Sequence, residues 1–185
     1  MSLEHAILGF LNYRPFTGYS LKKIFDTSVQ HFWPADQSQI YRTLSRLEED
    51  DWAEMEVVEQ ENRPNRKVYH ITDSGREELK HWLKNPLPFE PRRSAPLIQV
   101  FFAGQLSDEE VLAIFERDAK FIRAGLEQYE DIPEDMETYS DYVDSPREFY
   151  FWMLTLEAGK ESARANLAWI ESVIERIKNG EIPQE

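Results

Sequence analysis

The stretch that follows Asp36 places polar and cationic side chains opposite an apolar stripe. Asp36 is a favoured helix N-cap, and a helical rotation of about 100° per residue puts Ile40, Leu44 and Leu47 on one side. Ser38, Arg42 and Ser45 then lie directly opposite, with Gln37 and Gln39 in the first turn and Arg46 and Tyr41 on the two flanks. The acidic residues of the stretch are confined to positions 48–51 at its end. The pattern predicts a short helix with one buried face and one face equipped for hydrogen bonding.

Side chains of these types are suited to the recognition of double-stranded DNA. The major groove admits one helix, and its base edges offer donor and acceptor pairs that Gln, Arg and Ser can meet. Recognition helices generally enter the groove by their N-terminal turns, where Gln37, Ser38 and Gln39 stand, and the positive end of a helix suits phosphate. An ordinary solvated helix face explains the same pattern. This helix alone therefore leaves both interpretations open.

A basic hairpin follows the helix. Residues 53–60 alternate between apolar and acidic side chains, residues 67–72 form the return strand, and positions 62–67 between them contain Arg63, Arg66 and Lys67 with no acid. A helix-turn-helix followed by a basic two-stranded ribbon is the winged-helix arrangement, in which the ribbon reaches the DNA backbone or minor groove. Lys22 and Lys23 are further candidates for phosphate contacts. Charges that only protect a strand edge are the alternative, but the helix and hairpin together favour DNA binding.

The chain divides at a proline-rich linker, residues 85–96, which contains four of its ten prolines. The segment before the linker predicts three helices, a hairpin and a fourth helix, and the segment after it predicts helices throughout. Capping boxes at Ser107 and Ser145 begin the two longer helices of this second segment. We expect a mainly α protein: an N-terminal winged helix-turn-helix domain with a two-stranded wing over residues 1–88, and an all-helical dimerisation domain over residues 97–180.

The last predicted helix runs without a break from Ser145 to about Lys178, and its apolar residues recur every three or four positions. Such a stripe is a surface for another helix. The candidate dimerisation residues on it are Leu156, Ala163, Leu167, Ile170, Ile174 and Ile177. Packing against the predicted helix over residues 111–126 of the same chain is the alternative. Both can hold, because two helices of one chain hardly cover so long a stripe.

An aromatic run, residues 149–154, is apolar on every side of its helix, which predicts that it is buried on every side. The simpler interpretation is that the run fills a junction between domains or subunits. The sharper interpretation is an aromatic-lined effector pocket with Tyr150, Trp152 and Trp169 as its candidate walls.

Composition narrows the class of protein. The formal net charge is −14, and most of it lies in the second half, since residues 1–90 contain 11 basic and 15 acidic side chains and residues 91–185 contain 10 and 20. This argues against an overall attraction for nucleic acid but is compatible with a local basic patch. Cysteine is absent, which excludes disulfides and thiolate metal sites. No apolar run approaches the ~18 residues of a membrane span and no signal peptide is recognisable, so we expect a cytoplasmic protein with no membrane partner.

Catalytic motifs are lacking in the sequence. The histidines His5, His31, His70 and His81 have no metal-ligand spacing. There is no glycine-rich phosphate loop and no G-x-S-x-G nucleophile motif. We expect no enzyme activity, no metal and no cofactor.

Five segments resemble the PadR-type transcriptional regulators in order and spacing: residues 6–11 (AILGFL), 18–21 (GYSL), 38–48 (SQIYRTLSRLE), 66–72 (RKVYHIT) and 75–79 (GREEL). The helical second half looks like that of the family's larger subgroup. The resemblance implies a winged-helix DNA-binding domain, a homodimer built through C-terminal helices and, usually, repression, with release by phenolic acids or other aromatic compounds in some members. The family commonly has Gly where this chain has Asp51, and Asp tolerates the left-handed conformation of a helix end better than most residues.

These observations together predict a regulator that binds a double-stranded DNA operator as a homodimer, as a repressor, with a small aromatic effector as a further candidate partner. The alternative from another class is a winged-helix module whose helix and wing bind protein and which has no operator. A transcription activator is a third option, because activation and repression use the same DNA-contact chemistry. Binding to DNA that weakens steeply with salt distinguishes the first from the second.

Overall fold

The computed structural model of the chain describes residues 2–30, 32–60, 65–88, 93–134, 137–140, 142–143 and 145–183. The chain forms two compact units. The first comprises Met1–Pro88 with Asp141–Val143, and the second comprises Phe89–Ser140 with Asp144–Glu185. In the part of the chain that is described, no helix is long and apolar enough to cross a membrane.

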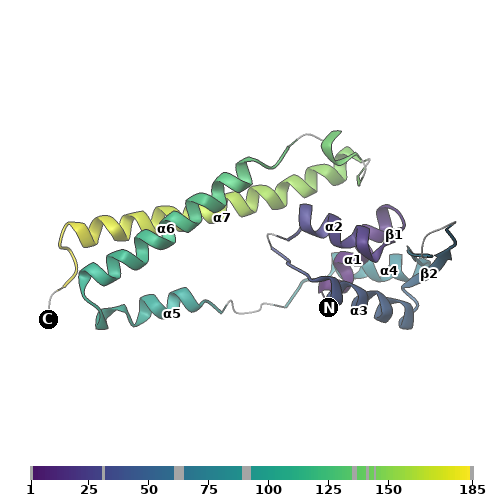
Figure 1. The fold of residues 1–185 in the computed structure, drawn as a ribbon, viewed down its shortest axis with the longest axis horizontal. Helices are drawn as coiled ribbons and strands as arrows, with labels where there is room; N and C mark the ends of the chain where they lie inside the picture. The colour runs from purple at the N-terminus through teal and green to yellow at the C-terminus, as the bar shows by residue number, and fades with distance from the viewer. Residues whose placement is uncertain are drawn as a thin grey trace. The chain divides into compact units, whose positions relative to one another are not determined.

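The first unit combines helices with a small antiparallel sheet (Figure 1). Its elements are α1 (Ser2–Tyr13), β1 (Phe16–Thr17), α2 (Gly18–Thr27), α3 (Gln37–Glu49), β2 (Ala53–Val58), β3 (Arg66–Ile71) and α4 (Asp73–Lys84). The predicted helices and hairpin are confirmed, but the sheet has the order β1-β3-β2, because Phe16 and Thr17 pair with Tyr69 and Val68. β1 was not among the predicted elements, since a strand of two residues has no period that a pattern can reveal.

The core of the first unit lies between α1, α2 and α3. The predicted stripe of α3, Ile40, Leu44 and Leu47, is fully buried. It packs in the same core as fully buried residues of α1 and α2, namely Ile7, Leu8, Leu21, Ile24 and Phe25. Burial of the stripe forces the opposite face of α3 outward, because the two faces are half a helical turn apart.

The end of α3 fixes where the wing begins. Asp51 has φ 59°, and the amides of Asp51 and Trp52 donate to the carbonyls of Glu48 and Leu47 at 3.1 and 2.8 Å, which is a Schellman motif. Asp51 thus adopts the left-handed conformation that Asp tolerates better than most residues. Gly75 of α4 lies against the same corner, since a Cβ there would stand 2.1 Å from the Trp52 carbonyl oxygen. The corner between α3, β2 and α4 is thus closely packed backbone.

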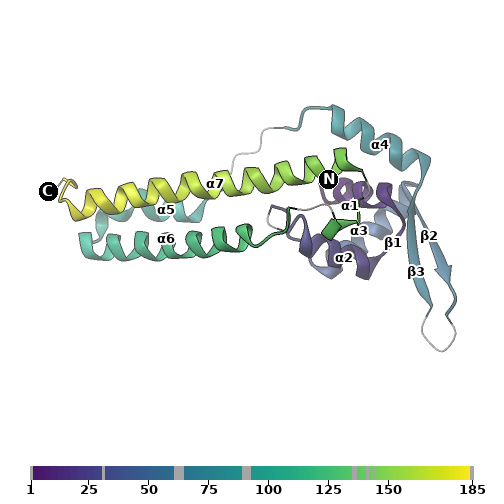
Figure 2. The ribbon, with the colours of Figure 1, turned by 90° about the horizontal axis from the view of Figure 1, so that it is seen from above.

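The second unit is an antiparallel helical hairpin with a short helix beside it (Figure 2). Its elements are α5 (Ala95–Phe101), η1 (Ala103–Gln105), α6 (Asp108–Glu130), η2 (Glu137–Tyr139) and α7 (Pro146–Lys178). The predicted caps at Ser107 and Ser145 are confirmed, because their hydroxyl oxygens accept hydrogen bonds from the backbone amides of Glu110 and Glu148. Ion pairs link α6 or the segment after it to α7 at successive levels: Glu116–Lys178, Arg123–Glu171, Glu130–Arg164 and Glu134–Lys160.

The stripe on α7 packs within the chain. Ile170 and Ile177 are buried against Val111, Phe115 and Ala119 of α6, and Leu167 and Ile174 are partly buried against the same cluster. Leu156 is also buried and Ala163 is half-buried. The intrachain alternative therefore describes most of this stripe. Side chains that are buried within one chain cannot contact a second copy. A dimer surface therefore consists of apolar side chains that one chain leaves exposed.

Candidate nucleic-acid interface

The polar face of α3 is open to solvent. Asp36 caps the helix, and all the side chains predicted to contact DNA from this helix are exposed: Gln37, Ser38, Gln39, Tyr41, Arg42, Ser45 and Arg46. The centre of the face is Arg42, whose Nε donates to the Ser38 carbonyl one turn earlier at 3.3 Å. Within the described residues Arg42 has no carboxylate partner. Its guanidinium therefore keeps the donors that a base edge or a phosphate can accept.

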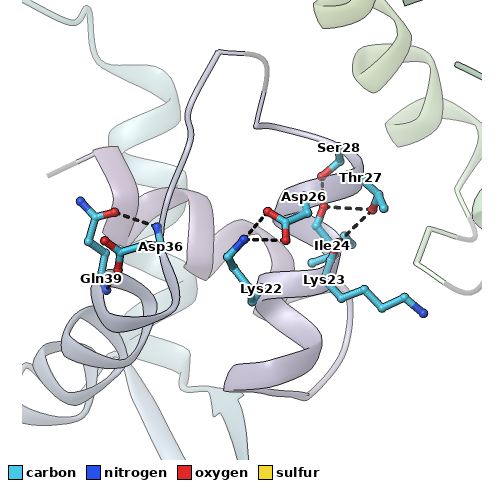
Figure 3. A network of polar contacts seen from close by, with 8 residues as sticks. All are labelled: Lys22, Lys23, Ile24, Asp26, Thr27, Ser28, Asp36 and Gln39. Atoms are coloured by element: carbon cyan, nitrogen blue, oxygen red, sulfur yellow. Dashed lines mark hydrogen bonds and ion pairs between the residues drawn. The ribbon is translucent and has the colours of Figure 1, made fainter. Parts of the chain in front are cut away.

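Gln39 is already used in part by the helix cap. Its backbone amide donates to the Asp36 carboxylate at 2.7 Å, and its Oε1 accepts the Asp36 amide at 2.8 Å (Figure 3). This reciprocal capping box leaves the side-chain NH₂ of Gln39 as its remaining donor group. The sequence pattern missed this role, because capping boxes usually place Glu or Gln after Ser or Thr and here the cap is Asp.

Arg46 is bonded to the neighbouring helix. Its Nη1 donates to Oε1 of Glu4 in α1 at 2.6 Å, and Glu4 is buried. Burial by itself raises the pKa of this carboxyl, but hydrogen bonds and charge from neighbouring cations, Arg46 among them, hold the pKa below its ordinary value of 4.5. Arg46 thus ties α3 to α1 through one nitrogen while its side chain stays exposed, and its DNA contact stays a prediction.

The two lysines of α2 do not share one role. Lys22 forms an ion pair with Asp26 one turn along the helix, so part of its charge is neutralised. Lys23 is exposed, and Figure 3 shows it extending away from Asp36 and Gln39 at the start of α3. A phosphate contact stays a prediction for both lysines.

The wing cations border a groove of about 600 Å³. One side of the groove consists of Thr17, Tyr19 and Ser20, around the start of α2, and Tyr41 of α3. The other side consists of Gln60, Asn65, Arg66 and Lys67, at the ends of β2 and β3. Arg63, predicted beside them, lies outside the described residues. Tyr19 was not among the residues predicted to contact DNA, and its side chain is 71% exposed.

The aromatic residues of α7 do not assemble into one pocket. Tyr150 contacts Phe151, Trp152 contacts Tyr139 at 6.3 Å between ring centroids, and Trp169 contacts Phe115 at 5.8 Å. Tyr150 and Trp169 are separated along one helix by about 28 Å at 1.5 Å per residue. Tyr150 and Trp169 therefore cannot both line one small-molecule site within a single chain. In a single chain Tyr150 and Phe151 are 61% and 50% exposed, so burial of the run on every side needs a second copy of the chain.

Comparison with known families accounts for both units. Residues 7–81 match the model of the transcriptional regulator PadR-like family, and residues 92–178 match that of the virulence activator alpha C-terminal domain. The chain thus combines a PadR-like domain with a virulence activator alpha C-terminal domain. PadR-like proteins are transcriptional regulators and not enzymes, in agreement with the sequence-based expectation. Among the residues described, no cluster of three or more His, Asp or Glu side chains is arranged to hold a metal ion.

Several PadR-like proteins can be compared along the chain. The probable transcriptional regulator Rv1176c of Mycobacterium tuberculosis is 46% identical over 98 residues, which are 52% of this chain and 52% of that protein. The negative transcriptional regulator PadR of Bacillus subtilis is 27% identical over 95% of this chain and 97% of its own length. The structure of B. subtilis PadR with operator DNA superimposes with a TM-score of 0.81, covering 96% of this chain and 99% of that one at 27% identity. The same protein has been solved with p-coumaric acid, with a TM-score of 0.76, coverage of 96% and 99%, and 26% identity.

Proposed function

We propose that this PadR-like regulator is a homodimeric repressor that binds a specific operator with α3 in the major groove. The observation that carries the proposal is the exposed polar face of α3, centred on Arg42 and held outward by the fully buried Ile40, Leu44 and Leu47. A helix of this kind, presented on a rigid core, meets the geometry of direct base recognition.

Repression is supported by the relative from B. subtilis, which is described as a negative regulator and has been solved on operator DNA. Occupation of an operator that overlaps a promoter excludes other proteins from that DNA. A bound regulator whose operator lies beside the promoter can activate with the same contacts. In vitro transcription from the operator-bearing promoter, with increasing protein, distinguishes the two, and we expect transcript to fall.

The dimer surface that we propose is centred on α5. No residue of this helix is buried. Its side chains Leu97, Ile98 and Phe101 are 58%, 61% and 81% exposed, and Phe121 on α6 is 80% exposed. Apolar side chains left this open in one chain usually mark an interface. A second copy covers them in our proposal, while Leu167, Ile170, Ile174 and Ile177 hold each chain's own hairpin together.

A small aromatic effector remains part of the proposal, on the support of the p-coumaric acid complex of the relative. Tyr150, Trp152 and Trp169 do not form its site as a group, for the geometric reason given above. Titration of p-coumaric acid into the protein–operator complex tests for release, and benzoic acid serves as a smaller aromatic carboxylate for comparison.

The experiment that tests the central proposal is selection of bound fragments from the organism's own genomic DNA, followed by footprinting at several salt concentrations. We expect a discrete protected site and an affinity that falls steeply with salt. A flat salt response without a protected site supports instead the winged-helix module that binds protein.

A further inference from the structure

The groove between the start of α2, Tyr41 and the wing has the chemistry of a binding site for an anionic chain. Arg66 and Lys67 line it, and none of its described lining residues is acidic, although the whole chain has a net charge of −14. Among the described residues, neither Arg66 nor Lys67 has a carboxylate partner. A local surplus of positive charge in so acidic a protein is complementary to a polyanion.

Two phenols add neutral donors to these cations. Tyr19 and Tyr41 both line the groove, with side chains 71% and 39% exposed. A phenol hydroxyl can donate to a phosphate oxygen, and its ring can pack on a sugar. An acidic peptide also satisfies two cations, but the phenols and the groove's position beside α3 favour DNA.

The position of Tyr41 is set by α2. A Cβ on Gly18 would stand 2.5 Å from the Tyr41 ring, so Gly18 permits the ring to lie directly on the start of α2. Tyr41 is therefore held in place before any ligand arrives, and it stands on the flank of α3 next to the exposed face that contains Arg42. A DNA strand bordering the major groove that receives α3 passes along this flank.

We propose that this groove holds one sugar-phosphate strand of the operator, with Tyr19 and Tyr41 donating to phosphate oxygens and Arg66 and Lys67 neutralising them. The proposal rests on the DNA-binding function proposed above and adds Tyr19 as a positioning residue. Contacts to phosphate carry no base information themselves, but they set the register in which α3 meets the bases.

The test uses the full-length protein and operator DNA synthesised with one neutral methylphosphonate linkage at a time. A methylphosphonate at the one or two linkages that the groove holds should weaken wild-type binding about tenfold. This is the size of effect expected when a hydrogen bond to a charged group is lost. The same linkages should no longer affect Tyr19→Phe or Arg66→Ala, because coupled groups are not additive. Lys80→Ala, which removes an exposed cation of α4, should keep the wild-type pattern.

The outcomes separate this inference from the function on which it rests. If every linkage weakens Tyr19→Phe, Arg66→Ala and wild type by the same factor, the groove does not hold the strand and the inference is overturned. If wild-type protein binds no genomic fragment better than random DNA of equal length, the proposed function itself fails.

Discussion

Arg42 and Arg46 are one turn apart on the same helix, yet their side chains have different hydrogen-bond partners. Arg46 donates to buried Glu4, whereas Arg42 contacts only its own helix among the described residues. Removal of Arg46 therefore tests the fold, and removal of Arg42 tests recognition. Sequence spacing could place both outside the core but could not separate the two roles.

Arg42→Ala should weaken operator binding by ~1–3 kcal/mol and relax specificity at one base pair, if Arg42 contacts a base edge through two hydrogen bonds. The measurement compares operator and random DNA in parallel. Equal losses on both would reassign Arg42 to a phosphate contact. Arg76→Ala, an exposed change on α4 that removes the same charge, should leave specificity unchanged.

Glu4→Gln should alter how stability depends on pH. The pKa of Glu4 is lowered in the folded protein, so its ionised form stabilises the fold above pH 4.5, and this contribution is lost as pH falls through the folded-state pKa. Urea unfolding from pH 7 to pH 3.5 should show wild type more stable than the variant at neutral pH, with the difference shrinking below about pH 4.5. Parallel curves at all pH values would contradict a lowered pKa of Glu4 in the folded protein.

At the scale of elements, the wing is joined to the recognition helix through very little chain. α3 ends at Glu49 and β2 begins at Ala53, and the Thr72 hydroxyl donates back to the Asp51 carbonyl at 2.7 Å. The direction of β2 and β3 is therefore set by the corner at Asp51 and Trp52. A change in that corner moves the wing cations relative to the face of α3.

Asp51→Gly should stabilise the protein by about 0.5–1 kcal/mol, because glycine adopts φ 59° without the steric cost that Asp bears. Asp51→Ala is the matched control and should destabilise by a similar amount, since alanine has the same Cβ without the local hydrogen bonding of Asp. Thermal and urea unfolding of both variants provides the measurement. Equal stabilities for Gly and Ala would show that backbone conformation at residue 51 does not limit stability.

Replacing Arg66 and Lys67 together by Ala should reduce the salt slope of DNA binding by about 2, one unit for each lost phosphate contact. Lys80 and Lys84 on α4 are exposed and provide the matched double variant, with the same change in net charge. Binding is measured over a series of salt concentrations. A slope that stays at the wild-type value in the Arg66 and Lys67 variant means that the wing ends do not touch DNA.

On the scale of the whole molecule, affinity for operator DNA depends on how many half-sites a monomer or dimer contacts at the same time. A single winged-helix unit covers one half-site, and joining two makes the second contact intramolecular, which raises overall binding by ~10²–10⁴ when the geometry fits. The α6–α7 hairpin is internally cross-linked by ion pairs and an apolar core. Each chain thus offers the proposed dimer a stable surface.

Phe101→Glu should give a folded monomer that binds the operator far more weakly, by ~10²–10⁴, although every residue of the DNA-binding unit is intact. The side chain is 81% exposed, so the charge does not disturb the fold of one chain. Ile170→Glu is the contrasting variant, because it places a charge in the buried α6–α7 core and should lower helical stability instead. Sedimentation measures the oligomeric state and a gel shift measures operator binding, both on one preparation. A Phe101→Glu protein that stays dimeric would mean that the interface lies elsewhere.

The sequence alone determined the elements and the outward face of α3. Periodicity and local capping are properties of neighbouring residues. The stripe of Ile40, Leu44 and Leu47 and the caps at Asp36, Ser107 and Ser145 were therefore predictable. The motifs that resemble PadR-type regulators also lie in continuous segments. These features need no knowledge of which distant residues meet.

Tertiary structure decided which polar side chains are available and which apolar ones are already covered. The pairing of Arg46 with Glu4, the short strand β1, the groove beside Tyr19 and the burial of Ile170 against Phe115 all join residues far apart in the chain. A helical pattern reports that one face is apolar, but it does not report what covers that face. Contacts between distant segments depend on packing of the whole unit, and packing is what assigned these residues to the fold, to DNA or to a second chain.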